Sequence, residues 1–393
     1  METKNFQLHT NVEELNQKIK VHRKKLITVA TFAFAVILVV VVGLYMYHQS
    51  KTYSSYYVLQ SKVREDSYGS QFVEFGGKIL KFGNDGAFYL DNSNNLIWSQ
   101  AFDMQNPITD VCGDYAVIAD KNGKQAFIVD ATGTCKKLET KLPIQKIHVA
   151  SQGVTAVLLK EGGSGKIQFY DRNGKFLVSG EVHTKGLGYP MDIALSDDGK
   201  KLALSTLDFK DGNINTNIVF YNFDSYGQNA IDNIVASYSY HDIIIPKVEF
   251  LTNDTMAAFG TNKIITFEGT QKPAEKKTIT IKEEIHSIFY NSRYFGITYS
   301  KENKNNSYQM IIYDLKGSEV QNIDFDMNYN KIEFLQNNEI CVRNDYECAI
   351  YTVRGIEKFN YKFKKNLHGI FSMGSGRNYI LLLEGTTEKI RLK

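Results

Sequence analysis

The feature that most constrains the fold is an apolar hairpin that recurs along most of the chain. One copy reads "QFVEFGGKILKF" from Gln71 and another reads "MDIALSDDGKKLALS" from Met191, each with two apolar strands around a turn. Aligned on one apolar position, the eight copies fall at Val73, Val111, Ile147, Ile193, Val248, Ile288, Ile332 and Ile370. A period of about forty residues with four strands per unit is typical of a β-propeller.

Each unit continues with a second hairpin, and four of these second hairpins share a turn signature. The copy at 169–178, "FYDRNGKFLV", places Gly174 three residues after Asp171. An aspartate accepts hydrogen bonds from the turn that follows it, and glycine or asparagine tolerates the positive φ that such a turn requires. The aspartates of the four copies are Asp91, Asp130, Asp171 and Asp314. We interpret them as turn formers, and we expect no metal site.

The eighth unit lacks a fourth strand, because only "EKIRLK" at 388–393 follows its first hairpin. A closed ring leaves no strand edge unpaired along its circumference, so the missing strand must come from elsewhere in the chain. The apolar stretch "YYVLQSKV" at 56–63 has no other assignment and is predicted to close the ring. The predicted fold is therefore an all-β, eight-bladed propeller of four-stranded blades. Seven blades, with one hairpin misread, is the alternative.

One long apolar run precedes the repeats. Residues 26–47, "LITVATFAFAVILVVVVGLYMY", carry no charge and would span roughly 33 Å as a helix, enough to cross a bilayer. A secretory signal peptide has a shorter apolar core and a cleavage site flanked by small residues, which this run lacks. We predict an uncleaved transmembrane helix, with a buried core helix as the alternative.

The charges around this run predict its orientation. Five Lys or Arg residues lie in 18–25, whereas Lys51 is the only one in the first dozen residues after the run. Basic residues favour the cytoplasmic side, so residues 1–25 are predicted to be a cytoplasmic tail. Residues 48–55 would then be a linker, and 56–393 an extracytoplasmic propeller at the cell membrane. The spacing of Val12, Leu15 and Ile19 is that of a helix that prolongs the anchor over 11–25.

The net charge of the predicted propeller does not favour binding to nucleic acid. The chain has 46 Lys and Arg against 43 Asp and Glu, and the excess of three lies within residues 1–25. The remainder is balanced, whereas nucleic-acid binding depends on clustered basic residues. We therefore expect no nucleic-acid partner.

Two of the four cysteines lie close together in the sequence. In "CVRNDYEC", a two-residue turn at Asn344 and Asp345 would set Cys341 directly opposite Cys348 on neighbouring strands. Both a cross-strand disulfide and a pair of buried free thiols are compatible with this arrangement.

The blades resemble those of quinoprotein-like and YVTN/WD40-like propellers. The stretch "YLDNSNNLIW" at 89–98 is similar to the Asp, Gly and Trp turn of pyrroloquinoline-quinone dehydrogenase blades. That family has a Trp in nearly every blade, whereas Trp98 is the only one here and Asn95 stands near the usual Gly, so no cofactor is expected.

A second resemblance covers nearly the whole chain. The stretch 194–232, with "VFYNF" followed by "YGQ", resembles an uncharacterised family of single-pass, membrane-anchored propellers from anaerobic Gram-positive bacteria. The resemblance implies one anchor helix followed by a propeller. It implies no catalytic residue.

The fourth unit offers one candidate binding surface because it is the longest. Its extra residues lie at 207–217 and 224–234, and long loops on a rigid scaffold often carry recognition. Asp208, Asp211, Asn213 and Asn215 could contribute to a calcium site. Their spacing departs from the twelve-residue calcium loop, and a solvated turn is the simpler interpretation. Aromatic and polar residues in the connections that flank this unit complete the candidate surface: Tyr189, Tyr240 and His241.

The innermost strands offer a second candidate. Charged residues flank the aligned apolar positions of several units, and two histidines, His286 and His368, lie nearby. The flanking residues are Glu74, Asp110, Lys146, His148, Asp192, Lys247, Glu249, Lys331 and Glu333. They predict either a mixed-charge mouth that binds a polar ligand or charge pairs between neighbouring blades around a wet channel.

These features favour a non-enzymatic binding or scaffold protein of the cell envelope, with an envelope protein or a wall glycan as partner. The alternative is an envelope enzyme that acts on polysaccharide with acids such as Glu249 and Glu333. A transmembrane sensor is a weaker alternative because a tail of 25 residues is too short for a known output domain. No residue is assigned a catalytic role.

Overall fold

The computed structural model describes residues 12–65, 69–162, 164–182, 188–210, 212–301, 306–374 and 376–393. Within these residues the chain forms one α-helix, 32 β-strands and two short 3-10 helices. The chain divides into two compact units, Met1–Thr52 and Tyr53–Lys393, and each is described by itself.

The first unit is built on α1, Val12–Gln49, a helix of 38 residues. It contains the predicted span 26–47 and also the basic segment before it. The stretch Asn16–Gly43 has a mean hydropathy of 2.8 in its apolar window, and it is long and apolar enough to cross a membrane. The hydroxyls of Thr28 and Thr31 donate to backbone carbonyls four residues earlier, so these polar groups are satisfied within the helix.

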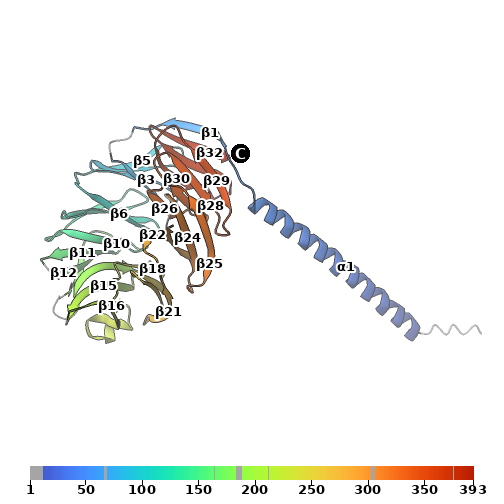
Figure 1. The fold of residues 1–393 in the computed structure, drawn as a ribbon, viewed down its shortest axis with the longest axis horizontal. Helices are drawn as coiled ribbons and strands as arrows, with labels where there is room; N and C mark the ends of the chain where they lie inside the picture. The colour runs from blue at the N-terminus through green and yellow to red at the C-terminus, as the bar shows by residue number, and fades with distance from the viewer. Residues whose placement is uncertain are drawn as a thin grey trace, which may run out of the picture. The chain divides into compact units, whose positions relative to one another are not determined.

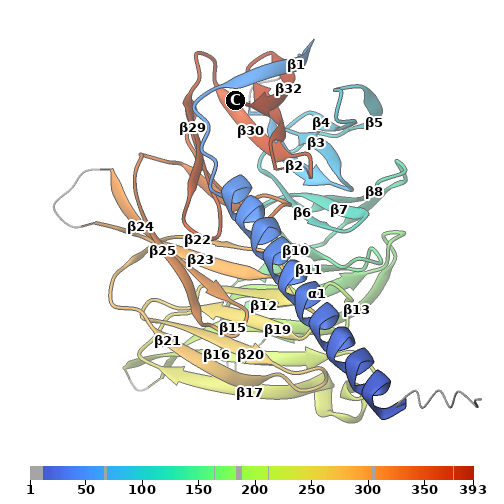
Figure 2. The ribbon, with the colours of Figure 1, turned by 90° about the vertical axis from the view of Figure 1, so that its right-hand side faces the viewer.

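The second unit is an eight-bladed β-propeller in which each blade is a four-stranded sheet (Figures 1 and 2). Blades 1 to 4 are β2–β5 (Gln71–Phe75, Lys78–Phe82, Gly86–Leu90, Leu96–Ala101), β6–β9 (Pro107–Cys112, Tyr115–Asp120, Gln125–Asp130, Cys135–Glu139), β10–β13 (Ile144–Val149, Thr155–Glu161, Ser164–Tyr170, Phe176–Val182) and β14–β17 (Tyr189–Leu195, Lys201–Lys210, Asn213–Asn222, Ile234–His241). Blades 5 to 7 are β18–β21 (Lys247–Thr252, Thr255–Phe259, Lys263–Glu268, Ala274–Thr280), β22–β25 (Ile285–Tyr290, Tyr294–Ser300, Ser307–Asp314, Glu319–Asp326) and β26–β29 (Lys331–Phe334, Ile340–Arg343, Glu347–Tyr351, Glu357–Lys362). Blade 8 is β30–β32 (Leu367–Ser372, Asn378–Leu383, Thr386–Leu392) with β1 (Tyr56–Val63). The eight-bladed prediction is confirmed.

The core lies between blades because each blade buries both of its faces. In blade 7, Ile340 and Val342 pack into a cluster with Met310 of blade 6, whereas Cys341 packs into a cluster with Leu381 of blade 8. Successive side chains of a strand point to opposite faces, so a middle strand of a blade must be apolar at every position. This explains the continuous apolar runs in the sequence. The first strands of neighbouring blades also contact one another, which makes them the inner strands of the ring.

The recurring aspartates form turns, as predicted. In blade 3, the backbone N–H groups of Asn173 and Lys175 donate to Asp171 Oδ1 at 2.9 and 2.8 Å, and Gly174 takes a φ of 74°. These backbone hydrogen bonds, that of Lys175 above all, hold the pKa of Asp171 below its usual value. Equivalent bonds are made by Asp91, Asp130 and Asp314. The same turn chemistry in separate blades explains why this sequence motif recurs.

Strand β1 closes the ring by pairing with β32. The antiparallel register runs from Tyr56 opposite Leu392 to Val63 opposite Thr386, and blue β1 lies beside red β32 in Figures 1 and 2. The Tyr56 ring packs against three aromatic rings of blade 7 at 5.0 to 6.5 Å between centroids. After the strand, the buried Arg64 donates to the Leu383 carbonyl at 2.8 Å. The last blade is therefore made from strands at the two ends of the propeller sequence.

Blade 4 owes its length to longer strands. The sequence predicted a loop at 207–217, but β15 and β16 continue through this segment to residues 210 and 213, so the prediction of a long loop is wrong here. Ile214, Thr216 and Ile218 alternate with polar residues, and this period of two suits an extended hairpin. The second insertion holds η1, Gly227–Asn229, and η2, Ile231–Asn233.

The two neighbouring cysteines are not directly opposite. Arg343 pairs with Cys348, and Cys341 pairs with Ile350, so the predicted two-residue turn is wrong. The Asn344 side chain accepts hydrogen bonds from the backbone N–H groups of Tyr346 and Glu347, which widens the connection. The two sulfur atoms still approach to 3.6 Å, and both residues are fully buried free thiols.

We expect the four cysteines to react slowly in the folded protein. Burial raises the pKa of Cys112 to about 12 and that of Cys135 to about 11, so little reactive thiolate forms at neutral pH. A colorimetric thiol assay should register four thiols on denaturation and a small fraction of them before it. Rapid reaction of all four in the native protein would contradict this burial, and a total of two would indicate that Cys341 and Cys348 are oxidised to a disulfide.

Candidate functional site

Asp192 is the centre of a charge network on the inner strands. It lies on β14 of blade 4 and is fully buried. Lys146 Nζ of blade 3 lies 3.0 Å from its Oδ1, and Lys247 Nζ of blade 5 lies 3.5 Å from its Oδ2. The Val248 backbone N–H also donates to Oδ2 at 3.1 Å. One carboxylate thus connects three consecutive blades.

The network continues into blades 5 and 6 through Glu249. Lys247 Nζ lies 2.7 Å from Glu249 Oε2, and the Tyr290 hydroxyl donates to the same oxygen at 2.8 Å. Burial alone would lower the pKa of Lys247, but Glu249, Tyr290 and Asp192 raise it well above its usual value. Burial and Glu249 raise the pKa of Tyr290 as well, so Lys247 stays protonated and Tyr290 stays neutral at physiological pH.

Two further acids of the inner strands also have partners. His148 Nδ1 lies 3.6 Å from Asp110 Oδ2, which accepts a hydrogen bond from the Val149 backbone N–H at 2.7 Å. In blade 7, Lys331 Nζ lies 2.9 Å from Glu333 Oε2 and Arg343 Nε lies 3.5 Å from its Oε1. The structure joins these predicted residues as charge pairs between and within blades.

Replacing Asp192 by Asn is expected to destabilise the propeller by about 2 kcal/mol. The change keeps the shape of the side chain but leaves Lys146 and Lys247 without the charge that they share. Urea unfolding followed by circular dichroism measures the effect. Asp208→Asn, at a partly exposed position of blade 4, is the control and should change stability by less than about 0.5 kcal/mol. Equal stability of both variants would show that Asp192 does not hold the three blades together.

Glu74 on β2 differs from the other inner-strand acids. Among the described residues, its carboxylate forms no hydrogen bond or ion pair. Burial raises its pKa to about 7, and the negative charge of Glu333 adds to the increase. The sequence placed Glu74 in the charged set but gave no signal that it would lack a partner.

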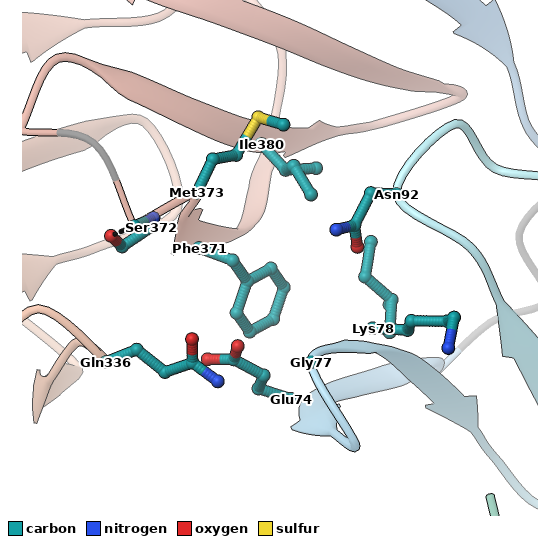
Figure 3. A pocket seen from close by; sticks show the side chains of 11 residues that line it. Glu74, Gly77, Lys78, Asn92, Gln336, Phe371, Ser372, Met373 and Ile380 are labelled. Carbon is teal, nitrogen blue, oxygen red and sulfur yellow. Dashed lines mark hydrogen bonds between the residues drawn. The ribbon is translucent and has the colours of Figure 1, made fainter.

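Glu74 lines a cavity of about 230 Å³ where blades 7, 8 and 1 meet (Figure 3). Gln336 comes from the turn after β26, Phe371 and Met373 come from the end of β30, and Asn92 comes from the turn after β4. These residues are far apart in sequence and follow no common spacing, so no sequence pattern pointed to the cavity.

The other candidate surface, which we name the blade-4 rim, consists of Tyr189, Asp208, Phe209, Tyr240 and His241. The register places Tyr189, Leu207, Thr216 and Tyr240 in one cross-strand row, so the two tyrosines lie about 14 Å apart at opposite edges of the blade. The neighbouring row contains Asp208, Asn215 and His241.

Within the blade-4 rim, the side chains differ in how they are held. The Tyr240 hydroxyl donates to Glu275 Oε2 at 3.0 Å, and His241 Nδ1 contacts Asn215 Oδ1. Phe209 is 71% exposed and Tyr189 is 40% exposed. Sequence reasoning missed Phe209, although an aromatic residue near the tip of a hairpin was a usable signal.

The calcium alternative receives no support from the residues that can be placed. Asp211 lies outside the described residues, and Asp208 faces Asn215 across the hairpin. Within the described part of the chain, no group of three or more His, Cys, Asp or Glu side chains is arranged to hold a metal ion.

The fold and the helix define the class of protein: an eight-bladed β-propeller that carries a long apolar N-terminal helix. Residues 49–392 match a family of unknown function, DUF5711, and the chain belongs to this family. None of the curated proteins matches the sequence.

Solved structures share the propeller fold at low sequence identity. BamB from Moraxella catarrhalis is 11% identical, with a TM-score of 0.53 over 86% of this chain and 100% of that one. Sqt1 from Saccharomyces cerevisiae is 14% identical, with a TM-score of 0.57 over 87% and 99% of the two chains. Chaetomium thermophilum Sqt1, solved bound to the N-terminus of the ribosomal protein L10, is 12% identical, with a TM-score of 0.52 over 84% and 100%. At these identities the likeness is one of fold alone.

Proposed function

We propose that this chain is a non-enzymatic binding or scaffold module of the cell envelope. In this proposal α1 anchors it in the cell membrane, the N-terminus is cytoplasmic, and the propeller is extracytoplasmic. The length and hydropathy of α1 support the anchor, and the basic residues in 18–25 support the orientation. The proposed partner is an envelope protein or a wall glycan.

The observation that carries the proposal is the blade-4 rim. Its two strands of ten residues are the longest in the propeller, and Phe209 is exposed at their end. An exposed aromatic side chain on a rigid hairpin is a typical anchor for a partner because little conformational entropy is lost on binding. A related fold, Chaetomium thermophilum Sqt1, was solved with a protein segment bound, which is a precedent for binding by such a scaffold.

The alternative of polysaccharide hydrolysis requires two carboxyl groups that face one another and can exchange protons with the substrate. Asp110, Asp192, Glu249 and Glu333 are each engaged by a cationic or histidine side chain. Such pairing suits a structural role better than acid and base catalysis. These contacts favour the binding proposal.

The membrane anchor is tested with the full-length protein in its own cell type. We expect the protein to remain in the membrane pellet after alkaline carbonate extraction, because the apolar helix cannot leave the bilayer. Protease added to intact, wall-stripped cells should digest the propeller. Release by carbonate would overturn the anchor, and protection of the propeller from protease would overturn the orientation.

The binding surface is tested by affinity capture with residues 52–393 against solubilised envelope proteins and wall fragments. A triple variant, Tyr189→Ala with Phe209→Ala and His241→Ala, is expected to lose at least tenfold in partner recovery. The matched control, Leu96→Ala with Ile97→Ala, removes exposed apolar side chains from blade 1 and should retain the partner. Equal recovery by both variants would place the binding surface elsewhere, and shortening of an added polysaccharide would favour the enzymatic alternative.

A further inference from the structure

The cavity beside Glu74 is lined by polar side chains that have no hydrogen-bond partner among the described residues. Four of the five aligned acids, namely Asp110, Asp192, Glu249 and Glu333, have a charged or histidine partner on the same strand or on another inner strand. The Glu74 carboxylate has none among the described residues, although it is partly buried. Burying a carboxylate without a partner costs free energy, so a positively charged group that binds beside Glu74 would be stabilised.

The walls of the cavity suit such a group. Figure 3 shows the Phe371 ring beside the Glu74 carboxylate, with Met373 and Ile380 forming an apolar side above it. A carboxylate attracts the charge of an ammonium group, and an aromatic ring beside it contacts both that charge and the C–H groups next to the nitrogen. Glu333 lies close enough to raise the pKa of Glu74, so it adds to the negative potential at this place.

The amides of the cavity add hydrogen-bonding capacity. Asn92 and Gln336 line opposite sides of it, and within the described residues neither side-chain amide has a hydrogen-bond partner (Figure 3). Each amide both donates and accepts, and this combination matches hydroxyl groups. The volume of 230 Å³ equals about eight water molecules, so the space fits a ligand of roughly that many heavy atoms or slightly more.

We propose that this cavity binds a small ligand in which a protonated amine is flanked by hydroxyl groups. The amine lies between the Glu74 carboxylate and the Phe371 ring, and the hydroxyl groups bind Asn92 and Gln336. An amino alcohol and an amino sugar share this chemistry. The site is separate from the blade-4 rim, and it does not depend on the membrane anchor.

The surrounding charges are compatible with a cation. Lys78 is the one basic residue on the cavity wall among the described residues, and Figure 3 shows its ammonium pointing away from Glu74. Its Nζ lies 5.6 Å from the centre of the Tyr89 ring. Other charged or titratable groups on the strands beside the cavity, among the described residues, are Lys81 of β3, Lys331 and Glu333 of β26, Arg343 of β27, His368 of β30 and Tyr379 of β31.

Binding is measured by isothermal titration calorimetry on the detergent-solubilised full-length protein with glucosamine and ethanolamine as probes. Glucose and ethylene glycol, which lack the amine, are the matched neutral ligands and should bind at least tenfold more weakly. Tighter binding of glucosamine than of ethanolamine would identify an amino sugar, and the reverse an amino alcohol. Equal affinity for the amines and their neutral counterparts would overturn the proposal. It would also be overturned if neither amine bound at concentrations up to about 10 mM.

The variants locate the ligand. Glu74→Gln preserves the size of the side chain and is expected to weaken amine binding at least tenfold, and Phe371→Leu should weaken it about fivefold. The control is Glu284→Gln, at an exposed position outside the cavity, which should bind as the wild type does. Thermal unfolding of each variant establishes that it is folded. Unchanged binding by folded Glu74→Gln would overturn the assignment of the site.

The pH dependence gives a second, independent readout. The pKa of Glu74 is raised to about 7, so its charged form becomes scarce below that pH. Ethanolamine keeps its proton from pH 6 to pH 8, and its affinity should therefore fall about tenfold between pH 8 and pH 6. Glu74→Gln should abolish this dependence. A pH profile that is identical in the wild type and in Glu74→Gln would contradict binding of the amine by Glu74.

Discussion

A propeller chain that begins at Ser70 is expected to lose its cooperative fold, whereas a chain that begins at Thr52 keeps it. The shorter chain lacks β1 and therefore leaves the edge of β32 unpaired along seven residue pairs. Each backbone hydrogen bond contributes about 1 kcal/mol net, and burial of Tyr56 against blade 7 contributes about 2 kcal/mol more. The loss is about 5 kcal/mol or greater, which is comparable with the whole stability of a domain.

Calorimetry and near-ultraviolet circular dichroism of the two chains measure this loss. The longer chain should unfold in a cooperative transition, and the shorter one should show a broad transition or none. A synthetic peptide of residues 52–65, added to the shorter chain, is the matched control because it supplies the missing strand without a covalent link. Identical melting of both chains would show that β1 is dispensable.

The second large effect is expected at a buried charged triad between blades 7 and 8. Lys358 Nζ donates to Glu339 Oε1, and also to the Tyr379 hydroxyl at 2.9 Å. The Tyr379 hydroxyl donates in turn to Glu339 Oε2, and all three side chains are buried. Lys358→Met leaves the Glu339 carboxylate buried without its cation, so we expect a loss of about 3 to 5 kcal/mol in the free energy of unfolding.

Two controls separate the charge from the packing. Replacing the whole triad, with Glu339→Leu, Lys358→Met and Tyr379→Phe together, should recover much of the stability because no buried charge remains. Lys276→Met, which removes one member of an exposed ion pair with Glu268, should cost less than about 1 kcal/mol. If Lys358→Met lowers the free energy of unfolding, measured with urea, by no more than Lys276→Met does, the triad is not important for stability.

The triad also makes the stability of the folded propeller depend on pH in the alkaline range. Burial and the Glu339 carboxylate raise the pKa of Tyr379 above its usual value. A group whose pKa is raised by folding contributes stability below its pKa in the unfolded chain, about 10 for tyrosine, and this contribution is lost as the pH rises above that value. Alkaline destabilisation above pH 10 should therefore be weaker in Tyr379→Phe than in the wild type.

The repeating parts of the fold were predictable from sequence because their causes are local. Turn chemistry at Asp171 and its counterparts depends on residues within four positions, and apolar strands recur with a period that marks each blade. The need to close the ring made 56–63 the natural partner for the last strand. Seven blades would have left one hairpin without a place in the ring.

The features that were missed or wrong depend on contacts between distant residues or on one side chain in a turn. Among the described residues Glu74 forms no ion pair, whereas Lys331 and Arg343 both pair with Glu333, and no spacing in the sequence encodes that difference. The cysteine register was wrong because the Asn344 side chain widens its turn. The triad joins residues that are 19 to 40 positions apart, so no local pattern identified it.

The way blade 8 is assembled also determines when the propeller can finish folding during synthesis. Strand β1 leaves the ribosome first, and its partner β32 follows about 330 residues later, which takes roughly 15 to 65 s at usual translation rates. Through that interval the backbone edge of β1 has no native partner and is open to mispairing with other chains. Retention of the nascent chain at its site of synthesis would keep other copies away until the last strand arrives.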